Sequence, residues 1–245
     1  MPEVPSRRAG AAGEPAAQRA VALVTGAGRR IGRAVATRLA EAGWDVAVHD
    51  HGSPDEVEAL CAQLRELGAR VEGLRADLAD EASARELVPS VARLLGRVDA
   101  VVNNACLLEY DSAAGFGGDC ALLHYRVNTI APVLLAQALH AELLARRRRG
   151  CVVNLLDHEP GNPDPGHFSC TLSKAALREA HTLLAQALAP QLRVVAVAPG
   201  MGQGTRAEDI ADAVLFALRN PAMSGCELLV DAGQHPQARS RDFSF

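Results

Sequence analysis

The chain has 245 residues, of which 49% are hydrophobic but only 3% aromatic. This length matches one α/β domain, and a core built mainly from Ala, Val and Leu suits helices packed on both faces of a buried parallel sheet. The net charge of −4 excludes a strongly basic surface and argues against nucleic acid as a main partner.

The cysteines and the hydropathy pattern exclude further classes. The six cysteines form no CxxC pair and show no metal-ligand spacing with the histidines. No apolar run approaches the ~18 residues of a membrane span, and no apolar segment follows Arg7-Arg8 as it would in an export signal. We therefore expect a reduced, cytoplasmic protein with no metal and no membrane partner.

Strand and helix signals alternate along most of the chain. Residues 1–19 lack periodicity and predict a disordered tail, residues 20–235 predict one domain, and residues 236–245 predict a second tail. Helices are predicted to begin near Ile31, Pro54, Glu81, Cys120, Ser169 and Ala207. The predicted strands are Val21–Val24, Val46–Val48, Val71–Leu74, Val98–Val102, Cys151–Leu155, Val194–Val197 and Glu227–Val230. This order indicates a Rossmann-type, doubly wound parallel sheet of about seven strands.

A glycine turn joins the first strand to the first helix, in the run Thr25-Gly26-Ala-Gly28-Arg29-Arg30-Ile31-Gly32. Gly26 allows a tight turn, and Gly32 lets the helix pack closely on the sheet. The helix N-terminus then offers N–H groups and a positive dipole end to a pyrophosphate. This segment predicts a dinucleotide-binding βαβ unit.

Polar residues follow the next three predicted strands. Asp50 ends the second strand, where an acid binds the adenosine ribose hydroxyls, Asp77-Leu78 follow the third, and Asn103-Asn104-Ala105 follow the fourth. Each alone is more often a loop-capping residue. Together, at the carboxyl ends of parallel strands, they predict a nucleotide site.

Taken together, these motifs resemble those of the short-chain dehydrogenase/reductase family, from Ala20 to Gln234. Arg30, where most members have glycine, and the run Val46-Ala-Val-His49 resemble the pteridine reductase branch. Asp157, after the fifth predicted strand, is similar to the aspartate that this branch has in place of the family's catalytic serine. The resemblance implies an NAD(P)-dependent oxidoreductase acting on a small carbonyl or pterin-like C=N substrate.

The resemblance leaves the cofactor open between NADP(H) and NAD(H). Arg29 matches the arginine that NADP-dependent relatives place against the 2′-phosphate. Asp50 matches the acid that NAD-dependent relatives use for the 2′-hydroxyl, and it would repel a phosphate. Pteridine reductases have an arginine where this chain has Gly52, although His51 and Ser53 could compensate. The balance favours NADP(H) slightly.

The resemblance also implies a catalytic tyrosine, a lysine four residues later and an asparagine on the preceding helix. Lys174 and Asn128 match the lysine and the asparagine, but the tyrosine position holds Cys170. No shift of register recovers it, because the chain's only tyrosines, Tyr110 and Tyr125, lie far upstream.

Cys170 allows three interpretations. As a proton donor, its pKa would be lowered by Lys174, but a thiol is shorter than a phenol and would need a bridging water. As a structural residue, it fills the tyrosine's place in the core, and we favour this reading. A nucleophilic role beside Lys174 and His167 is a third option. His167 is itself either a replacement acid or a residue of a surface loop.

A second departure from the family follows the sixth predicted strand. Pro199-Gly200 match the turn that meets the nicotinamide carboxamide. Relatives then insert roughly twenty residues of substrate lid, which closes the site and excludes water. Here only Met201 to Arg206 precede the next predicted helix, so the lid is almost absent.

These features leave three hypotheses. The first is an NAD(P)-dependent reductase with atypical proton donation, and the second is a catalytically inactive relative acting as a nucleotide-binding or hetero-oligomer partner. The third, cofactor-independent chemistry, has the least support. The resemblance also implies a homo-oligomer, a dimer or tetramer. The basic run Arg146 to Arg149 predicts a solvated helix C-terminus rather than a phosphate or partner site.

Overall fold

The protein is described from a computed structural model, which covers residues 18–156, 165–200 and 204–233. The predicted tails therefore fall almost wholly outside the described residues, as does Asp157.

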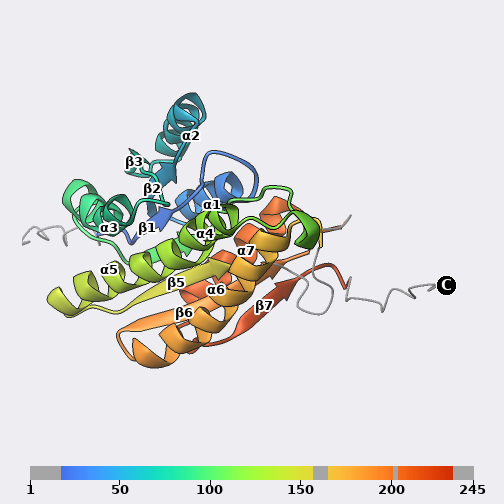
Figure 1. The fold of residues 1–245 in the computed structure, drawn as a ribbon. Helices are drawn as coiled ribbons and strands as arrows, with labels where there is room; N and C mark the ends of the chain where they lie inside the picture. Colours follow the sequence, from blue (N-terminus) through green and yellow to red (C-terminus); the bar gives the residue numbers. More distant parts are fainter. Residues whose placement is uncertain (1–17, 157–164, 201–203, 234–245) are drawn as a thin grey trace, which may run out of the picture.

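Seven parallel strands form one sheet, as predicted, in the order β3-β2-β1-β4-β5-β6-β7 (Figure 1). The strand order reverses between β1 and β4, which pair directly, and β1 also pairs with β2. Polar groups after these strands therefore meet at one edge of the sheet. The strands are β1 (Val21–Val24), β2 (Asp45–Asp50), β3 (Val71–Arg75), β4 (Ala100–Asn103), β5 (Gly150–Leu155), β6 (Leu192–Pro199) and β7 (Glu227–Val230).

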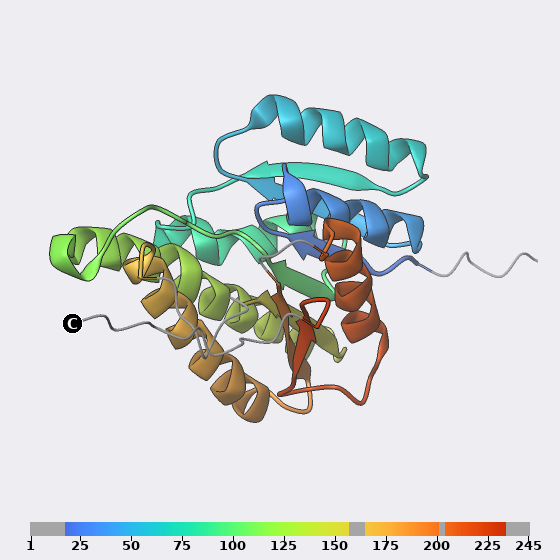
Figure 2. The same ribbon diagram turned by 90° about the vertical axis from the view of Figure 1, so that its right-hand side faces the viewer.

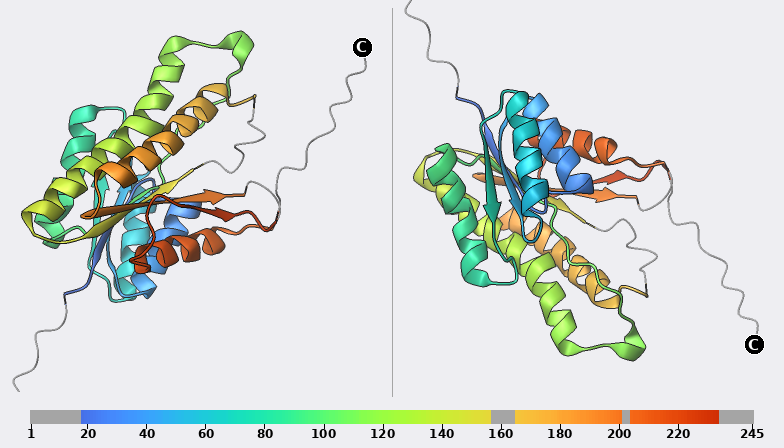
Figure 3. Two further views of the ribbon diagram at one scale, coloured as in Figure 1. Left: turned by 90° about the horizontal axis from the view of Figure 1, so that it is seen from below. Right: turned by 90° about the horizontal axis from the view of Figure 1, so that it is seen from above.

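Helices cover both faces of this sheet, as Figures 2 and 3 show. The helices α1, α2 and α7 pack on one face of the sheet, and the helices α3, α5 and α6 pack on the other. The buried strand side chains between them are mostly Val, Ala and Leu, as expected for a sheet buried on both sides. The helices are α1 (Arg30–Glu41), α2 (Pro54–Glu66), α3 (Glu81–Leu95), α4 (Gly118–Tyr125), α5 (Ala131–Ala145), α6 (Phe168–Ala187) and α7 (Ala207–Arg219).

The long helix predicted to begin near Cys120 contains a change of winding. A π-helical turn, η2 (Arg126–Ile130), joins α4 to α5. The run Gly118–Ala145 has the length and composition of a membrane span, contrary to the expectation that no segment approaches one, but half of its most apolar window is buried inside the protein. Its apolar residues, among them Leu135 and Leu139, pack in the core beside α3 and the sheet.

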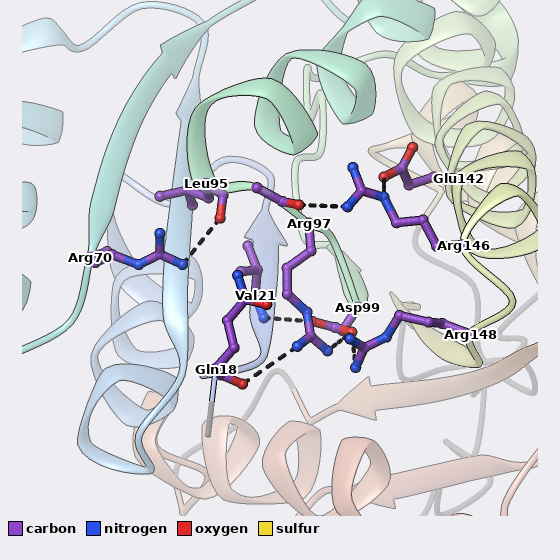
Figure 4. A network of polar contacts seen from close by, with 10 residues as sticks. Gln18, Val21, Arg70, Leu95, Arg97, Asp99, Glu142, Arg146 and Arg148 are labelled. Carbon is purple, nitrogen blue, oxygen red and sulfur yellow. Dashed lines mark hydrogen bonds and ion pairs between the residues drawn. The ribbon is translucent and has the colours of Figure 1, made fainter. Parts of the chain in front are cut away.

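Asp99 lies at the amino edge of the sheet, opposite the glycine turn, and organises a buried charged network (Figure 4). Its carboxylate accepts the Val21 N–H at 2.9 Å and pairs with Arg97 and, at 3.3 Å, with Arg148. A side-chain oxygen thus accepts the N–H of the first residue of β1, while the backbone of Asp99 still bonds to Val21 and Cys151. The strand β4 begins at Ala100, two residues after the predicted Val98.

The basic run after α5, Arg146 to Arg149, is exposed, as predicted for a solvated helix end, and two of its arginines also take part in this network. Arg146 donates to the Gly96 carbonyl at 2.7 Å and pairs with Glu142, while Arg148 pairs with Asp99. These arginines join the end of α5 to the turn between α3 and β4 (Figure 4).

We expect Asp99→Asn to lower the free energy of unfolding by about 3 kcal/mol, because the nearly isosteric amide leaves Arg97 buried without its counter-charge. Arg97 and Asp99 expose only 6% and 7% of their surface. Urea unfolding followed by circular dichroism measures the change. Glu86→Gln is the control, since its pair with Arg93 is exposed on both sides and should change the free energy by less than about 0.5 kcal/mol. Equal effects of the two substitutions would contradict the assignment.

Candidate active site

The glycine turn after β1 has no room for side chains on its inner side. Gly26 has a φ of +60°, and a Cβ there would lie 2.9 Å from the Ala105 Cα. A Cβ at Gly32 would collide with the Gly26 carbonyl. A Cβ at Gly28 would lie 2.9 Å from the Asp50 carboxylate. The turn is therefore a backbone-lined cradle of the kind that binds a pyrophosphate at a helix N-terminus.

Arg30 is the first residue of α1, and its φ is +48°. This left-handed conformation costs a residue with a Cβ roughly 1 kcal/mol relative to glycine. Glycine at this position would be free of this cost. Ile31, the next residue, packs against the core and fixes the start of the helix.

Thr25 and Asn104 fasten the end of β1 to the end of β4. The Thr25 hydroxyl accepts the N–H groups of Asn104 and Ala105, both at 3.0 Å. The Asn104 carboxamide donates in return to the carbonyls of Thr25 and Gly26 at 2.9 Å. Both predicted residues, Asn104 and Ala105, are thus placed at the glycine turn, and the Asn104 side chain holds the turn in shape.

Asp50 and Asp77 lie at the same edge, where the adenosine end of a dinucleotide would bind. Asp50 Oδ1 accepts the N–H groups of Gly52 and Ser53 and so organises the loop before α2. Asp77 Oδ1 accepts the Ala79 N–H at 2.8 Å and lies 3.5 Å from His51 Nδ1. The side chain of Leu78, which follows Asp77, is buried in the core. Both carboxylates therefore also cap loops.

Arg29 reaches across the turn to α2. Its guanidinium pairs with Glu56 and donates to the Ser53 hydroxyl at 2.8 Å, and its side chain is 66% exposed. A cation and a hydroxyl therefore meet beside Asp50, where a 2′-phosphate could bind. The carboxylates of Glu56 and Asp50 stand in the same place and oppose a second negative charge.

His49 lies beneath the glycine turn and was not singled out as a site residue from the sequence. Its Nε2 lies 3.1 Å from the Ala76 carbonyl, and its Nδ1 lies 3.5 Å from the Gly26 N–H. A neutral ring that donates from Nε2 and accepts at Nδ1 satisfies both contacts. Burial lowers the pKa of His49. The run Val46-Ala-Val-His49 entered the family resemblance, but a histidine in a hydrophobic strand is common in cores, so this position alone did not indicate a contact with the glycine turn.

Lys174 and Cys170 lie one turn apart on α6, which passes the carboxyl end of β5. Lys174 is 6% exposed and donates from Nζ to the Leu155 carbonyl at 2.8 Å. Cys170 is 2% exposed. Its burial agrees with the interpretation of Cys170 as a structural residue of the core. The thiol also lies near Asn128, another residue that the sequence predicted for the site.

Asn128 is in the π-helical turn η2 and connects three segments. Its Oδ1 accepts the Leu107 N–H at 2.7 Å, and its Nδ2 donates to the Leu107 carbonyl at 2.9 Å. Nδ2 also lies 3.0 Å from the Ser173 hydroxyl and 3.8 Å from the Cys170 sulfur. Single π-turns frequently mark functional sites. The structure thus brings Asn128, Cys170 and the segment before Lys174 together.

Asp111 is a second residue that the sequence did not indicate. Its carboxylate accepts the backbone N–H of Ser169 at 3.0 Å and the Ser169 hydroxyl at 2.5 Å. Bonds from the Ser169 side chain and backbone lower the pKa of Asp111. A carboxylate at the N-terminus of α6 interacts favourably with the positive end of the helix dipole. Asp111 thereby fixes the start of the helix that carries Cys170.

The remaining predicted residues lie around this helix and the end of β6. His167 precedes α6 and packs edge-on against Tyr110, so it connects the start of α6 with the loop after β4. Pro199 ends β6, and Gly200 donates its N–H to the Val230 carbonyl at 2.7 Å. Gly200 packs closely on Asp231, since a Cβ there would lie 2.7 Å from its Cα.

Glu109, Cys120 and His124 form a cluster that the sequence spacing did not suggest. One candidate metal-ligand atom from each lies within 4.8 Å of the others. Both ring nitrogens of His124 are already engaged, however, Nδ1 with the Cys120 carbonyl at 2.9 Å and Nε2 with the Glu109 N–H at 3.4 Å. The buried ring therefore anchors the loop after β4 to α4.

Comparisons with known proteins agree with this geometry. The family described as short chain dehydrogenase matches residues 20–213. A curated relative, the 3-oxoacyl-(acyl-carrier-protein) reductase FabG of Staphylococcus epidermidis, is 31% identical over 73% of each chain.

Two similar solved structures hold NADP. The FolM alternative dihydrofolate reductase 1 of Brucella canis, complexed with NADP, has a TM-score of 0.85 and 32% identity, covering 92% of this chain and 98% of that one. A short chain dehydrogenase of Burkholderia cenocepacia in complex with NADP has a TM-score of 0.81 and 30% identity, covering 88% and 98%.

We expect the His49 ring to make stability depend on pH. Above its unfolded pKa, ~6.5, both states hold a neutral ring and stability is full. Below that value the unfolded chain takes a proton that the folded chain, with its lowered pKa, does not. Stability is therefore lost as the pH falls from ~6.5 through the folded pKa, with a limiting slope of about 1.4 kcal/mol per pH unit.

Urea unfolding between pH 7.5 and 5 measures this slope. His49→Gln should reduce it, whereas His51→Gln, at an exposed neighbour, should reduce it much less, because the charge of His51 is the smallest of the causes that act on the pKa of His49. An unaltered slope in His49→Gln would show that the buried ring is not the titrating group.

Proposed function

This chain belongs to the short-chain dehydrogenase family, and we propose that it is an NADPH-dependent reductase of a small substrate with a C=N bond, pterin-like in character. The observation that carries the proposal is the Lys174 ammonium, held by Leu155 at the carboxyl end of β5 with Asn128 and Cys170 on the adjoining turns. These polar groups converge where the sheet edge places a ligand.

The nicotinamide cofactor, when bound, supplies a hydride. The glycine turn and the N-terminus of α1 would hold its pyrophosphate, and Asp50 and Asp77 lie at the adenosine side. Lys174 would hold the nicotinamide ribose by its ammonium donors, because Leu155 takes only one of them. Pro199 and Gly200, at the end of β6, would meet the carboxamide.

Asn128 and Cys170 would act on the proton side of the reaction. Asn128 keeps the loop after β4 against α6 through its bonds to Leu107 and Ser173. The Cys170 thiol is buried and shorter than a tyrosine, so it would pass a proton through a bridging water. Reduction of a C=N bond depends less on a proton donor supplied by the protein than reduction of a ketone does, because the product nitrogen can take its proton from water.

Further parts of the proposal rest on the family resemblance. Asp157 would accept from pterin N–H groups, and the connection between β6 at Pro199 and α7 at Ala207 is a shortened substrate lid. Large apolar side chains exposed on α4 and α6 favour a homo-oligomer, and hetero-assembly with an active paralogue is the alternative. These side chains include Leu122, Leu172 and Leu183. We propose a cytoplasmic location.

The preference for NADPH follows from Arg29 and Ser53, which meet beside the adenosine site. Similar structures bind NADP, and a guanidinium binds phosphate strongly. The Glu56 carboxylate competes for the same guanidinium.

We expect Arg29→Ala to weaken NADPH binding roughly tenfold and leave NADH binding nearly unchanged, because only NADPH carries the 2′-phosphate. Glu56→Gln should do the reverse and tighten NADPH binding several-fold. Isothermal titration of both cofactors measures the affinities. If the protein binds neither cofactor, the proposed function is wrong; if Arg29→Ala weakens both equally, the phosphate site lies elsewhere.

Turnover tests the chemical half of the site. We expect NADPH oxidation with a dihydropterin, followed at 340 nm, to fall at least about a hundredfold in Lys174→Ala, because an oriented cationic donor to the cofactor is lost. Cys170→Tyr should raise the rate by about tenfold or more, since a phenol reaches further than a thiol. Turnover unaffected by Lys174→Ala would place the reaction elsewhere. Activity that arises only in Cys170→Tyr would mark the natural chain as inactive.

A further inference from the structure

Two thiols meet at the candidate active site. Cys106 lies in the loop after β4, and Cys170 lies in the first turns of α6. Their sulfur atoms are 3.9 Å apart although the residues are 64 positions apart in the chain. Contact between two sulfurs over such a separation requires that both segments be held in place by the fold.

Asn128 holds the two segments together. Its carboxamide makes a paired hydrogen bond with the backbone of Leu107, the residue after Cys106. The same carboxamide donates toward Ser173 and the Cys170 sulfur. The Ser173 hydroxyl in turn donates to the Cys170 carbonyl at 2.6 Å. The sulfur contact is thus part of a hydrogen-bonded arrangement.

The two thiols differ in accessibility. Cys106 is exposed, whereas Cys170 is 2% exposed. A reagent in solution therefore meets Cys106 first, and Cys170 is placed to react with the product. We propose that Cys106 and Cys170 form a redox-active dithiol, which a low-molecular-weight disulfide converts into an intramolecular disulfide.

The chemistry is two successive thiol–disulfide exchanges. The Cys106 thiol loses its proton and attacks one sulfur of the small disulfide, which gives a mixed disulfide on Cys106 and releases one small thiol. The Cys170 thiol then loses its proton and attacks the Cys106 sulfur, releasing the second small thiol. The two protein thiols are oxidised by two electrons, and the small disulfide is reduced to two thiols.

Closing the bond requires the sulfurs to approach from 3.9 Å to about 2.05 Å. Cys106 lies outside any helix or strand, so a side-chain rotation with a small shift of its loop can supply the movement. Cys170 stays on its helix, which Asp111 fixes at Ser169.

Other cysteines of the chain serve as internal comparators. Cys151 is buried, and burial raises its pKa to about 12. Burial also raises the pKa of Cys61. Both should stay as thiols under conditions in which Cys106 reacts. Cys120, which is partly accessible, is a suitable control position.

The disulfide would remove the thiol from the place where a proton donor is needed. If the proposed reductase function holds, oxidation should stop turnover and dithiothreitol should restore it. The dithiol itself does not depend on that function, and its test needs no cofactor.

The test treats the fully reduced, folded protein with glutathione disulfide, then unfolds it in guanidinium chloride with iodoacetamide so that every remaining thiol is alkylated, and measures the mass of the intact chain. The wild type should lose two hydrogens and leave four thiols to be alkylated, with Cys106 linked to Cys170 in the peptide map. Cys170→Ser should instead accumulate one glutathione on Cys106, about tenfold more than the wild type, because the intramolecular second step is absent. Cys106→Ser should keep Cys170 as a thiol, and Cys120→Ser should behave as the wild type.

Three results would overturn the proposal. They are a wild type in which all six thiols are alkylated, a Cys170→Ser variant without the adduct on Cys106, and loss of the disulfide in Cys120→Ser. Circular dichroism of each variant checks that the fold is intact. A positive result together with absent NADPH binding would keep the dithiol and reject the reductase.

Discussion

The pairing of β1 with both β2 and β4 is the constraint on which the candidate site depends. The strands β2 and β3 lie on one side of β1, and β4 to β7 lie on the other. The connections that follow β1 and β4 therefore lead away from each other and leave a crevice at the carboxyl ends of these strands. The Thr25–Asn104 hydrogen bonds fix that divergence. The strand order alone therefore places a cofactor-binding edge at the carboxyl ends of β1 and β4.

The chemical half of the site depends on a different interaction, the carboxamide of Asn128. A regular α-helix through Arg126–Ile130 would turn this side chain relative to α6, whereas the π-turn presents it to the loop after β4 and to α6 at once. In both halves of the site, a buried or half-buried carboxamide holds neighbouring segments together by hydrogen bonds: Asn104 at the glycine turn and Asn128 between the loop after β4 and α6.

Much of this arrangement was predictable because its signals are local. The strand runs of Val and Leu and the helix starts at Pro54 and Glu81 match the structure to within a few residues. The glycine turn was predictable because Gly26 and Gly32 are required by backbone geometry. Motif spacing also led to Lys174 and Cys170.

The unpredicted features arise from contacts between distant segments. The apolar pattern of the long helix did not reveal the change from α to π winding, because that change is confined to the five residues Arg126–Ile130. Asp111 and His49 act on residues far away in the sequence or on backbone atoms, which no spacing rule reports. The pairing of the exposed Arg148 with Asp99 was not predicted, because one strand and two helices separate the two residues in the chain.

The Asp99 network also bears on the order in which the chain can fold. Its bond to Val21 closes a loop of 78 residues, and its bond to Arg148 brings in the segment that leads to β5. The first βαβ units therefore remain incomplete until β4 has been synthesised and docked, because the amino end of β1 lacks its acceptor. During synthesis on the ribosome, the nucleotide half should mature only after the middle of the chain emerges. A fragment that ends before Asp99 should behave as a collapsed intermediate rather than as an autonomous domain.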